Sequence, residues 1–115
     1  MTGAATPILH PTPGVTLQWL MDDGVEADAG LSLARMTVEP GFTSEAHRHP
    51  NSTEAVHVVA GRVEQRRGDD WVPLETGETV LIPADAAHQT RNVGDETAVL
   101  MLVYSTGARE YVVVE

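Results

Sequence analysis

Two histidines in this sequence have the spacing of metal ligands. His47 and His49 are two residues apart in the segment GFTSEAHRHP (41–50), which begins next to a Pro-Gly turn. Residues two apart on a strand point to the same face, so both imidazoles can reach one point while Arg48 points away. Such a pair is half of a metal site. A third nitrogen ligand and a carboxylate would complete a site for Fe, Mn, Ni, Co, Cu or Zn.

The histidine pair belongs to the first of two blocks with regular spacing. The first block contains Gly41, His47, His49, Glu54 and Gly61. The second block contains Gly77, Pro83, His88 and Asn92. Together they resemble the paired motifs of the cupin superfamily. The second block departs from the family pattern at Asp85, where the family usually has Gly, but Asp tolerates the positive φ expected at that turn better than most residues.

The resemblance implies an all-β fold, a double-stranded β-helix or jelly-roll barrel with one divalent transition metal ion at its centre. It implies that the ligands are His47, His49, Glu54 and His88. The residues around Glu54 agree with this interpretation, because Glu54 begins an apolar run and shares its parity with Val56 and Val58. A buried unpaired carboxylate is costly, and a bound metal would remove that cost.

The other polar candidates have weaker support. His57 lies three residues after Glu54 and should face away from the metal, and His10 lies between prolines near the start of the chain. Asn92 is expected to form hydrogen bonds in a turn. Arg35 interrupts an apolar run and could clamp a substrate carboxylate, although a solvated strand face is favoured. Tyr104 could supply a hydroxyl to the site, although packing at the barrel end is favoured.

The rest of the chain consists of short extended runs separated by Gly, Pro and Asp turns. No window of ten residues keeps a helical apolar period, which favours an antiparallel sandwich or barrel. Residues 1–14 carry three prolines and two glycines and are expected to form a flexible arm before one barrel domain over 15–115. Trp19 and Met36 are expected in the core or the pocket wall. Strands are expected at 15–21, 31–38, 54–60, 62–67, 71–74, 79–82, 97–104 and 109–114.

Composition excludes several classes of function. The net charge is −10, from 17 acidic and 7 basic residues, so the chain has too few cations to bind nucleic acid or an anionic membrane surface. The absence of cysteine excludes disulfides, thiolate metal sites and cysteine nucleophiles. No apolar run has the length of a signal peptide or membrane span, so a cytoplasmic location is expected.

Three functions fit a metal held by three histidines and one glutamate. The favoured hypothesis is a small dioxygenase that acts on an enol or flavonol-like substrate, as in the quercetinase-type cupins that the chain resembles, with Glu54 as catalytic base. The second is a non-redox isomerase, cyclase, lyase or decarboxylase that uses the metal as a Lewis acid. The third is a non-catalytic small-ligand-binding cupin. The resemblance also implies a homodimer, in which the apolar tail YVVVE (111–115) is a candidate edge strand that needs covering.

Overall fold

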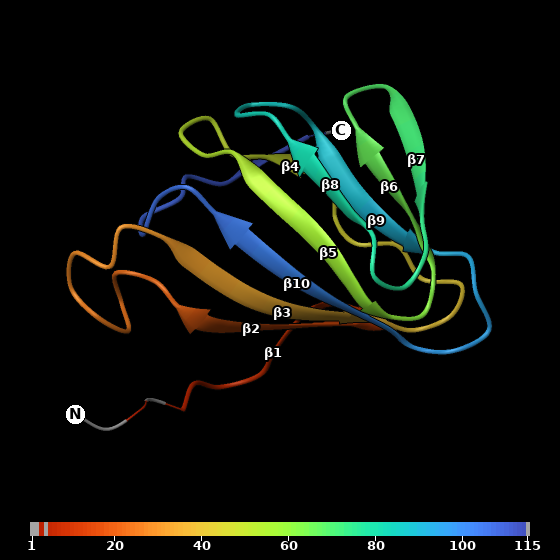
Figure 1. Ribbon diagram of the computed structural model, residues 1–115, viewed down its shortest axis with the longest axis horizontal. Coiled ribbons are helices and arrows are strands. Elements are labelled where there is room, and N and C mark those ends of the chain that lie inside the picture. Colours follow the sequence, from red (N-terminus) through yellow and green to blue (C-terminus); the bar gives the residue numbers. More distant parts are fainter. Residues whose placement is uncertain (1–2, 4, 115) are drawn as a thin grey trace.

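The computed structural model describes residue 3 and residues 5–114, and these form two antiparallel sheets that face each other (Figure 1). The strands are β1 (Leu9–Thr12), β2 (Val15–Met21), β3 (Ser32–Val38), β4 (His47–Arg48), β5 (Glu54–Ala60), β6 (Val63–Arg67), β7 (Asp70–Leu74), β8 (Thr79–Ile82), β9 (His88–Asn92), β10 (Ala98–Tyr104) and β11 (Val112–Val113). One sheet has the order β1-β2-β3-β10-β5-β8 and the other β11-β4-β9-β6-β7. The predicted all-β jelly-roll barrel is confirmed. No helix in the described part of the chain is long and apolar enough to cross a membrane.

The core lies between the two sheets and is filled mainly by branched aliphatic side chains. Burial alternates residue by residue along β3, β5 and β10, as expected for strands with one face on a core. Val38, Val56, Val58, Leu100 and Ile82 are almost completely buried. The side chains that alternate with them point outward. Branched aliphatic residues, rather than aromatic ones, therefore fill most of the interior.

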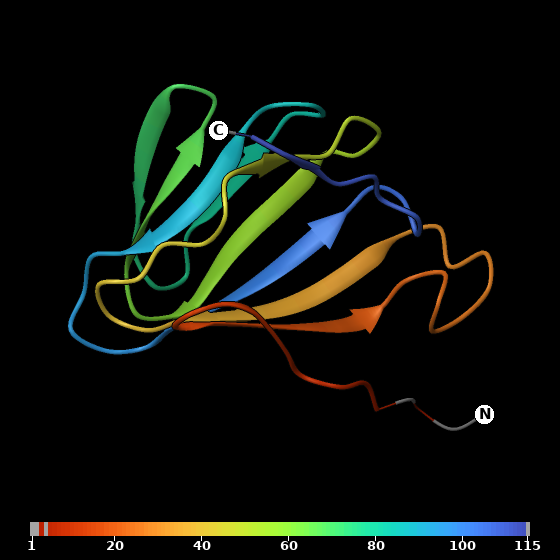
Figure 2. The same ribbon diagram turned by 180° about the vertical axis from the view of Figure 1, so that it is seen from behind.

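The strand registers place the predicted ligands opposite one another. His47 on β4 is paired with His88 on β9, and both belong to the five-stranded sheet. Glu54 is the first residue of β5 in the six-stranded sheet, where it is paired with Tyr104 of β10. The two sheets face each other (Figure 2), and this brings histidines of one sheet close to the carboxylate of the other.

The structure differs from the predicted flexible arm over residues 1–14. Residues 9–12 form β1, which pairs with β2 in a hairpin whose turn contains Gly14 at a φ of 74°. The prolines that suggested a loose segment fit this arrangement, because Pro11 lies on an edge strand and Pro13 in the turn. Residues 1, 2 and 4 of the predicted arm and residue 115 of the predicted tail lie outside the described residues.

Other strand boundaries also differ from those predicted. The expected strand over 109–114 is limited to Val112–Val113, and β4 and β9 were not among the strands expected from the sequence. Asp85 has the positive φ predicted for it, 68°.

Two motif glycines hold left-handed conformations at turns, and they provide a test of the fold. Gly61 and Gly77 have φ values of 84° and 90°. A Cβ on Gly61 would lie 3.0 Å from the Cα of Ala98, whereas a Cβ on Gly77 would have no neighbour within 4 Å. The first position therefore combines backbone strain with a steric contact, and the second has strain alone.

We predict that Gly77→Ala lowers the free energy of unfolding by about 1–2 kcal/mol, the cost of a side chain in the left-handed region. Gly61→Ala should cost more, because the backbone of β10 must also shift. Urea unfolding of both variants measures the difference. Equal losses would mean that the contact with Ala98 is relieved at no cost.

Candidate metal centre

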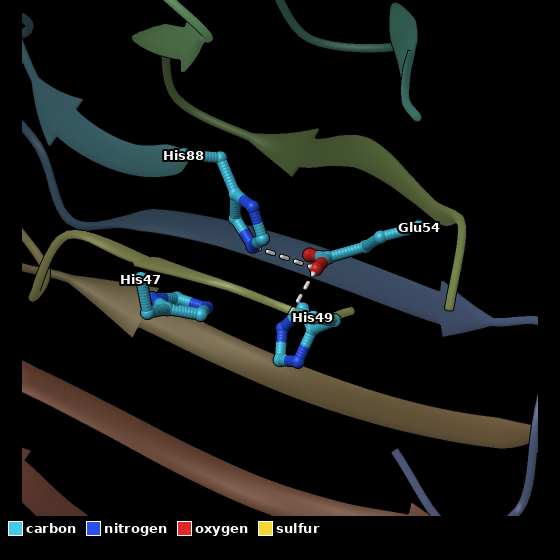
Figure 3. Close-up of side chains that lie close together, drawn as sticks. All are labelled: His47, His49, Glu54 and His88. Atoms are coloured by element: carbon cyan, nitrogen blue, oxygen red, sulfur yellow. Dashed lines mark ion pairs between the residues drawn. The ribbon is translucent and has the colours of Figure 1, made fainter. Parts of the chain in front are cut away.

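Four side chains from both sheets converge on one point between them. His47, His49, Glu54 and His88 each offer one ligand atom, and these atoms all lie within 4.8 Å of one another. His49, Glu54 and His88 are 2–3% exposed, and His47 lies at the edge of the cluster. Figure 3 shows the three imidazoles and the carboxylate pointing toward a common centre. The sequence predicted this set of four residues, and the structure brings all of them together.

Backbone carbonyls fix how each imidazole presents its nitrogens. The Nδ1 atoms of His47 and His49 lie 2.7 Å from the carbonyl oxygens of Glu45 and Glu110, and Nδ1 of His88 lies 3.0 Å from that of Ala86. A carbonyl oxygen only accepts hydrogen bonds, so each Nδ1 carries the proton. Each Nε2 atom therefore keeps an unprotonated lone pair for the centre, the arrangement that orients histidine ligands of metals.

The atoms at the centre are buried without hydrogen bonds. Among the described residues, Nε2 of His49, Nε2 of His88 and Oε1 of Glu54 have no hydrogen-bond partner. The two nitrogens lie 3.4 and 3.0 Å from this oxygen. While the imidazoles are neutral, three electron-rich atoms that face one another in a dry interior repel one another and lack solvation, which is costly. A divalent cation satisfies all three at once, and three imidazoles with one carboxylate suit a first-row metal ion. The cluster therefore fits a divalent metal site.

The charges of the cluster suit ligation as well. Burial alone would raise the pKa of Glu54, but the contacts with His49 and His88 outweigh it and lower this pKa to about 2. Burial, together with the neighbouring His88, lowers the pKa of His47 to about 4. Burial opposes protonation of His88 too, but its contact with Glu54 raises the pKa above the usual value, so a metal ion would have to displace a proton from between Nε2 of His88 and the carboxylate. At neutral pH the carboxylate is ionised and His47 is neutral, the states that bind a metal.

A cavity of about 430 Å³ opens beside the cluster, and its two sides differ in character. The six-stranded sheet contributes apolar and aromatic side chains: Val15, Leu17, Trp19, Met36, Leu102 and Tyr104. The five-stranded sheet and the segment before it contribute polar side chains: Ser44, Glu45, His47, His88, Gln89 and Thr90. A ligand in this cavity would have one face on hydrocarbon and one edge on hydrogen-bonding groups next to the clustered histidines.

Four other polar residues considered in the sequence analysis lie outside the cluster. His57 lies on the outer side of β5, where its Nδ1 contacts the Thr79 hydroxyl at 2.7 Å, and it is not part of the cluster. His10 and Arg35 are exposed on β1 and β3, and Arg35 does not line the cavity. Asn92 is buried and donates hydrogen bonds to the carbonyls of Val38 and Glu96.

Tyr104 lies closer to the site than the favoured packing role implied. It is 3% exposed, lines the cavity, and its ring lies 5.0 Å from that of His49. Burial, followed by the negative charge of Glu54, raises the pKa of Tyr104 well above 10, so its hydroxyl stays protonated. Sequence reasoning missed Arg109 and Tyr111, which also line the cavity. The only signal was the polar pair Arg109-Glu110 directly before Tyr111, the first residue of the apolar tail.

Comparison with known proteins agrees with this geometry. The chain is 42% identical over 69 residues to the polyketide synthase CurC of Streptomyces cyaneus, a match that covers 60% of this chain and 42% of that protein. It is 45% identical over 64 residues to protein SchB of Streptomyces halstedii, which covers 56% of this chain and 46% of that protein. The chain thus spans less than half of the length of these curated relatives.

Solved structures show the same fold. A variant of Bacillus subtilis oxalate decarboxylase superposes with a TM-score of 0.84 at 21% identity, covering 94% of this chain and 30% of that chain. An oxalate oxidase superposes with a TM-score of 0.80 at 25% identity, covering 98% of this chain and 60% of that chain. The family model for the cupin domain matches residues 34–104, from β3 to the end of β10, and includes all four clustered side chains. The chain therefore belongs to the cupin family.

Proposed function

We propose that this metal-dependent cupin is an enzyme that converts a small enolic or phenolic compound, with His47, His49, Glu54 and His88 as the ligands of one divalent ion. The observation that carries the proposal is the position of the cluster in the wall of a two-sided cavity. A structural metal needs no such opening, so the cavity argues against a purely structural ion and favours a site that admits a small molecule.

A first-row ion held by these four side chains would act as a Lewis acid and would stabilise negative charge on a substrate oxygen. The protein's part is to orient the substrate. Leu17, Met36 and Leu102 offer an apolar wall to a flat ring or chain, and Thr90 and Ser44 offer polar groups on the opposite side. This arrangement would direct the oxygen-bearing edge of the substrate toward the histidines.

Two side chains can handle protons in this cavity. Glu54 is ionised at neutral pH and can accept a proton, although its low pKa suits only a substrate proton made acidic by a nearby cation. Tyr104 keeps its proton and can donate a hydrogen bond to a developing oxyanion. We assign Glu54 as the base and Tyr104 as the hydrogen-bond donor.

We favour oxygen-dependent chemistry, a dioxygenase acting on an enol or flavonol-like substrate, because the apolar wall and the open cluster leave room for both reactants. The second candidate is a non-redox reaction such as a cyclisation, in which the cation acts as a Lewis acid. The similarity to the polyketide synthase CurC supports it, because its name points to a poly-oxygenated carbon chain. Manganese is the first metal to test, since the structures of oxalate decarboxylase include one described by its Mn(II) centres.

We also propose that the protein is a homodimer in the cytoplasm. The outer face of the six-stranded sheet carries a row of apolar side chains, because Leu81, Ala55 and Val103 are neighbours across β8, β5 and β10. Leu81 and Val103 are 55% and 43% exposed. A second copy that packs on this face would remove the exposed apolar surface from water.

Replacing His47, His49 or His88 by Ala should remove most of the bound metal, because each change removes one of the three nitrogen ligands. His57→Ala should leave the metal content near that of the wild type, because His57 lies outside the cluster. Metal analysis of protein purified without an affinity tag measures this. Loss of metal from the His57 variant as severe as that from the others would contradict the assignment.

Turnover of an enol or flavonol-like compound should consume oxygen and stop under anaerobic conditions, and it should vary strongly between manganese, iron, nickel and zinc. Glu54→Gln should keep part of the metal, because three imidazoles remain, but lose most of the rate if the carboxylate accepts the substrate proton. Oxygen uptake and product analysis with each metal loaded in turn provide the measurement. Equal activity without oxygen and with zinc would replace the oxygenase by the Lewis-acid enzyme.

Sedimentation at micromolar concentrations should show a dimer for the wild type and a monomer for Leu81→Glu, because a carboxylate in an apolar interface is not solvated. Val93→Glu is the matched control, since Val93 is 42% exposed but follows β9 in the other sheet. A wild-type monomer, or equal dissociation of both variants, would refute this interface.

A further inference from the structure

Residues 108–114, called here the C-terminal strap, follow β10 of one sheet and contain β11, which is the edge strand of the other sheet and lies beside β4 (Figure 2). The backbone pairing of the strap with that sheet is short. β11 forms only two residue pairs with β4. Asn51 bonds to the strap twice, at the carbonyl of Ala108 (3.0 Å) and the N–H of Glu110 (2.8 Å), and the N–H of Val114 donates to the carbonyl of Ala46 at 3.0 Å. A segment at a sheet edge with short backbone pairing opens more readily than the core.

The strap contacts two of the four clustered side chains. The backbone carbonyl of Glu110 accepts the hydrogen bond from Nδ1 of His49 at 2.7 Å. The ring of Tyr111 stacks on the imidazole of His47, with centroids 4.5 Å apart and planes 19° from parallel. The Tyr111 hydroxyl donates to Oε1 of Glu45 at 2.5 Å, and the carbonyl of the same Glu45 receives the hydrogen bond from Nδ1 of His47.

The strap also forms part of the cavity wall. The guanidinium of Arg109 lies 3.1 Å from the centroid of the Trp19 ring, and its Nη1 is paired with Asp22 at 3.0 Å. Arg109 and Tyr111 both line the cavity. Residues 109–111 thus contact the four-residue cluster and the aromatic end of the cavity, and they directly precede the edge strand of the second sheet.

We propose that docking of the C-terminal strap and metal binding are coupled, with Tyr111 as the positioning residue for His47 and the Glu110 carbonyl for His49. The inference rests on the proposed role of these histidines as ligands. A docked strap holds both imidazoles with Nε2 toward the centre, so a bound ion favours the docked strap. By linkage, the factor by which the ion favours the docked strap equals the factor by which docking raises the metal affinity. Undocking of the strap must therefore weaken metal binding.

The test compares Tyr111→Ala with Val113→Ala, a matched control on the same strap whose side chain is 57% exposed. Metal affinity is measured by competition with a chelator, using manganese and cobalt. Tyr111→Ala should weaken the affinity by about 10-fold or more, the effect typical of residues that orient metal ligands. Val113→Ala should stay close to the wild type, and Tyr111→Phe, which keeps the stacked ring, should lose less than Tyr111→Ala.

Amide hydrogen exchange gives a second readout that does not depend on activity. Metal should slow the exchange of the Glu110 and Val114 N–H groups in the wild type, and this protection should shrink in Tyr111→Ala. Thermal unfolding of the metal-free variants shows whether Tyr111 merely packs. A lower melting temperature with unchanged metal affinity, or metal binding that leaves strap exchange unaltered, would overturn the coupling.

The outcomes separate this inference from the proposed function. Metal binding with a responsive strap but no turnover of any enolic compound would refute the enzyme and leave the coupling intact. Stoichiometric metal binding with an indifferent strap would refute the coupling alone. A wild-type protein that takes up no metal would refute both.

Discussion

The interaction on which this structure depends is the burial of one carboxylate opposite imidazole nitrogens that, while the rings are neutral, have no proton to donate to it. Glu54 is 3% exposed, and the Nδ1 protons of the nearby histidines are already bound to backbone carbonyls. In a barrel interior this group of lone pairs would be strongly unfavourable without a cation. The hydrogen bonds that fix the rings are therefore costly for the metal-free protein and useful only if an ion is bound.

The two sheets meet this constraint through their registers. His47 is paired with His88, and Glu54 is paired with Tyr104, so backbone pairing brings the proposed ligands and the proposed hydrogen-bond donor together. A slip of one residue would turn the inward side chains of a strand outward. The left-handed turns at Gly61 and Gly77, on either side of the β6–β7 hairpin, help to fix these registers.

The parts predicted from sequence are those whose signal is local. Strands over 15–21, 54–60 and 79–82 agree with the structure because branched residues line their inward faces. β9 was missed because its inward residues are His88, Thr90 and Asn92, which gives no apolar alternation. The contacts of Tyr111 with His47 and of Glu110 with His49 join residues about 60 positions apart, and no local pattern reveals such pairs.

The charges around the cavity indicate what the proposed centre would accept as its next ligand. Three neutral imidazoles and one carboxylate leave a divalent ion with a net charge of about +1. The cation that lines the cavity at the aromatic end, Arg109, is paired with Asp22, and the Glu45 carboxylate, which accepts a hydrogen bond from Tyr111, keeps its negative charge. A site of this kind would stabilise an enolate or phenolate more than the neutral compound, and this would lower the pKa of the bound hydroxyl group. A carboxylate as weakly basic as Glu54 could then remove the proton of that hydroxyl group.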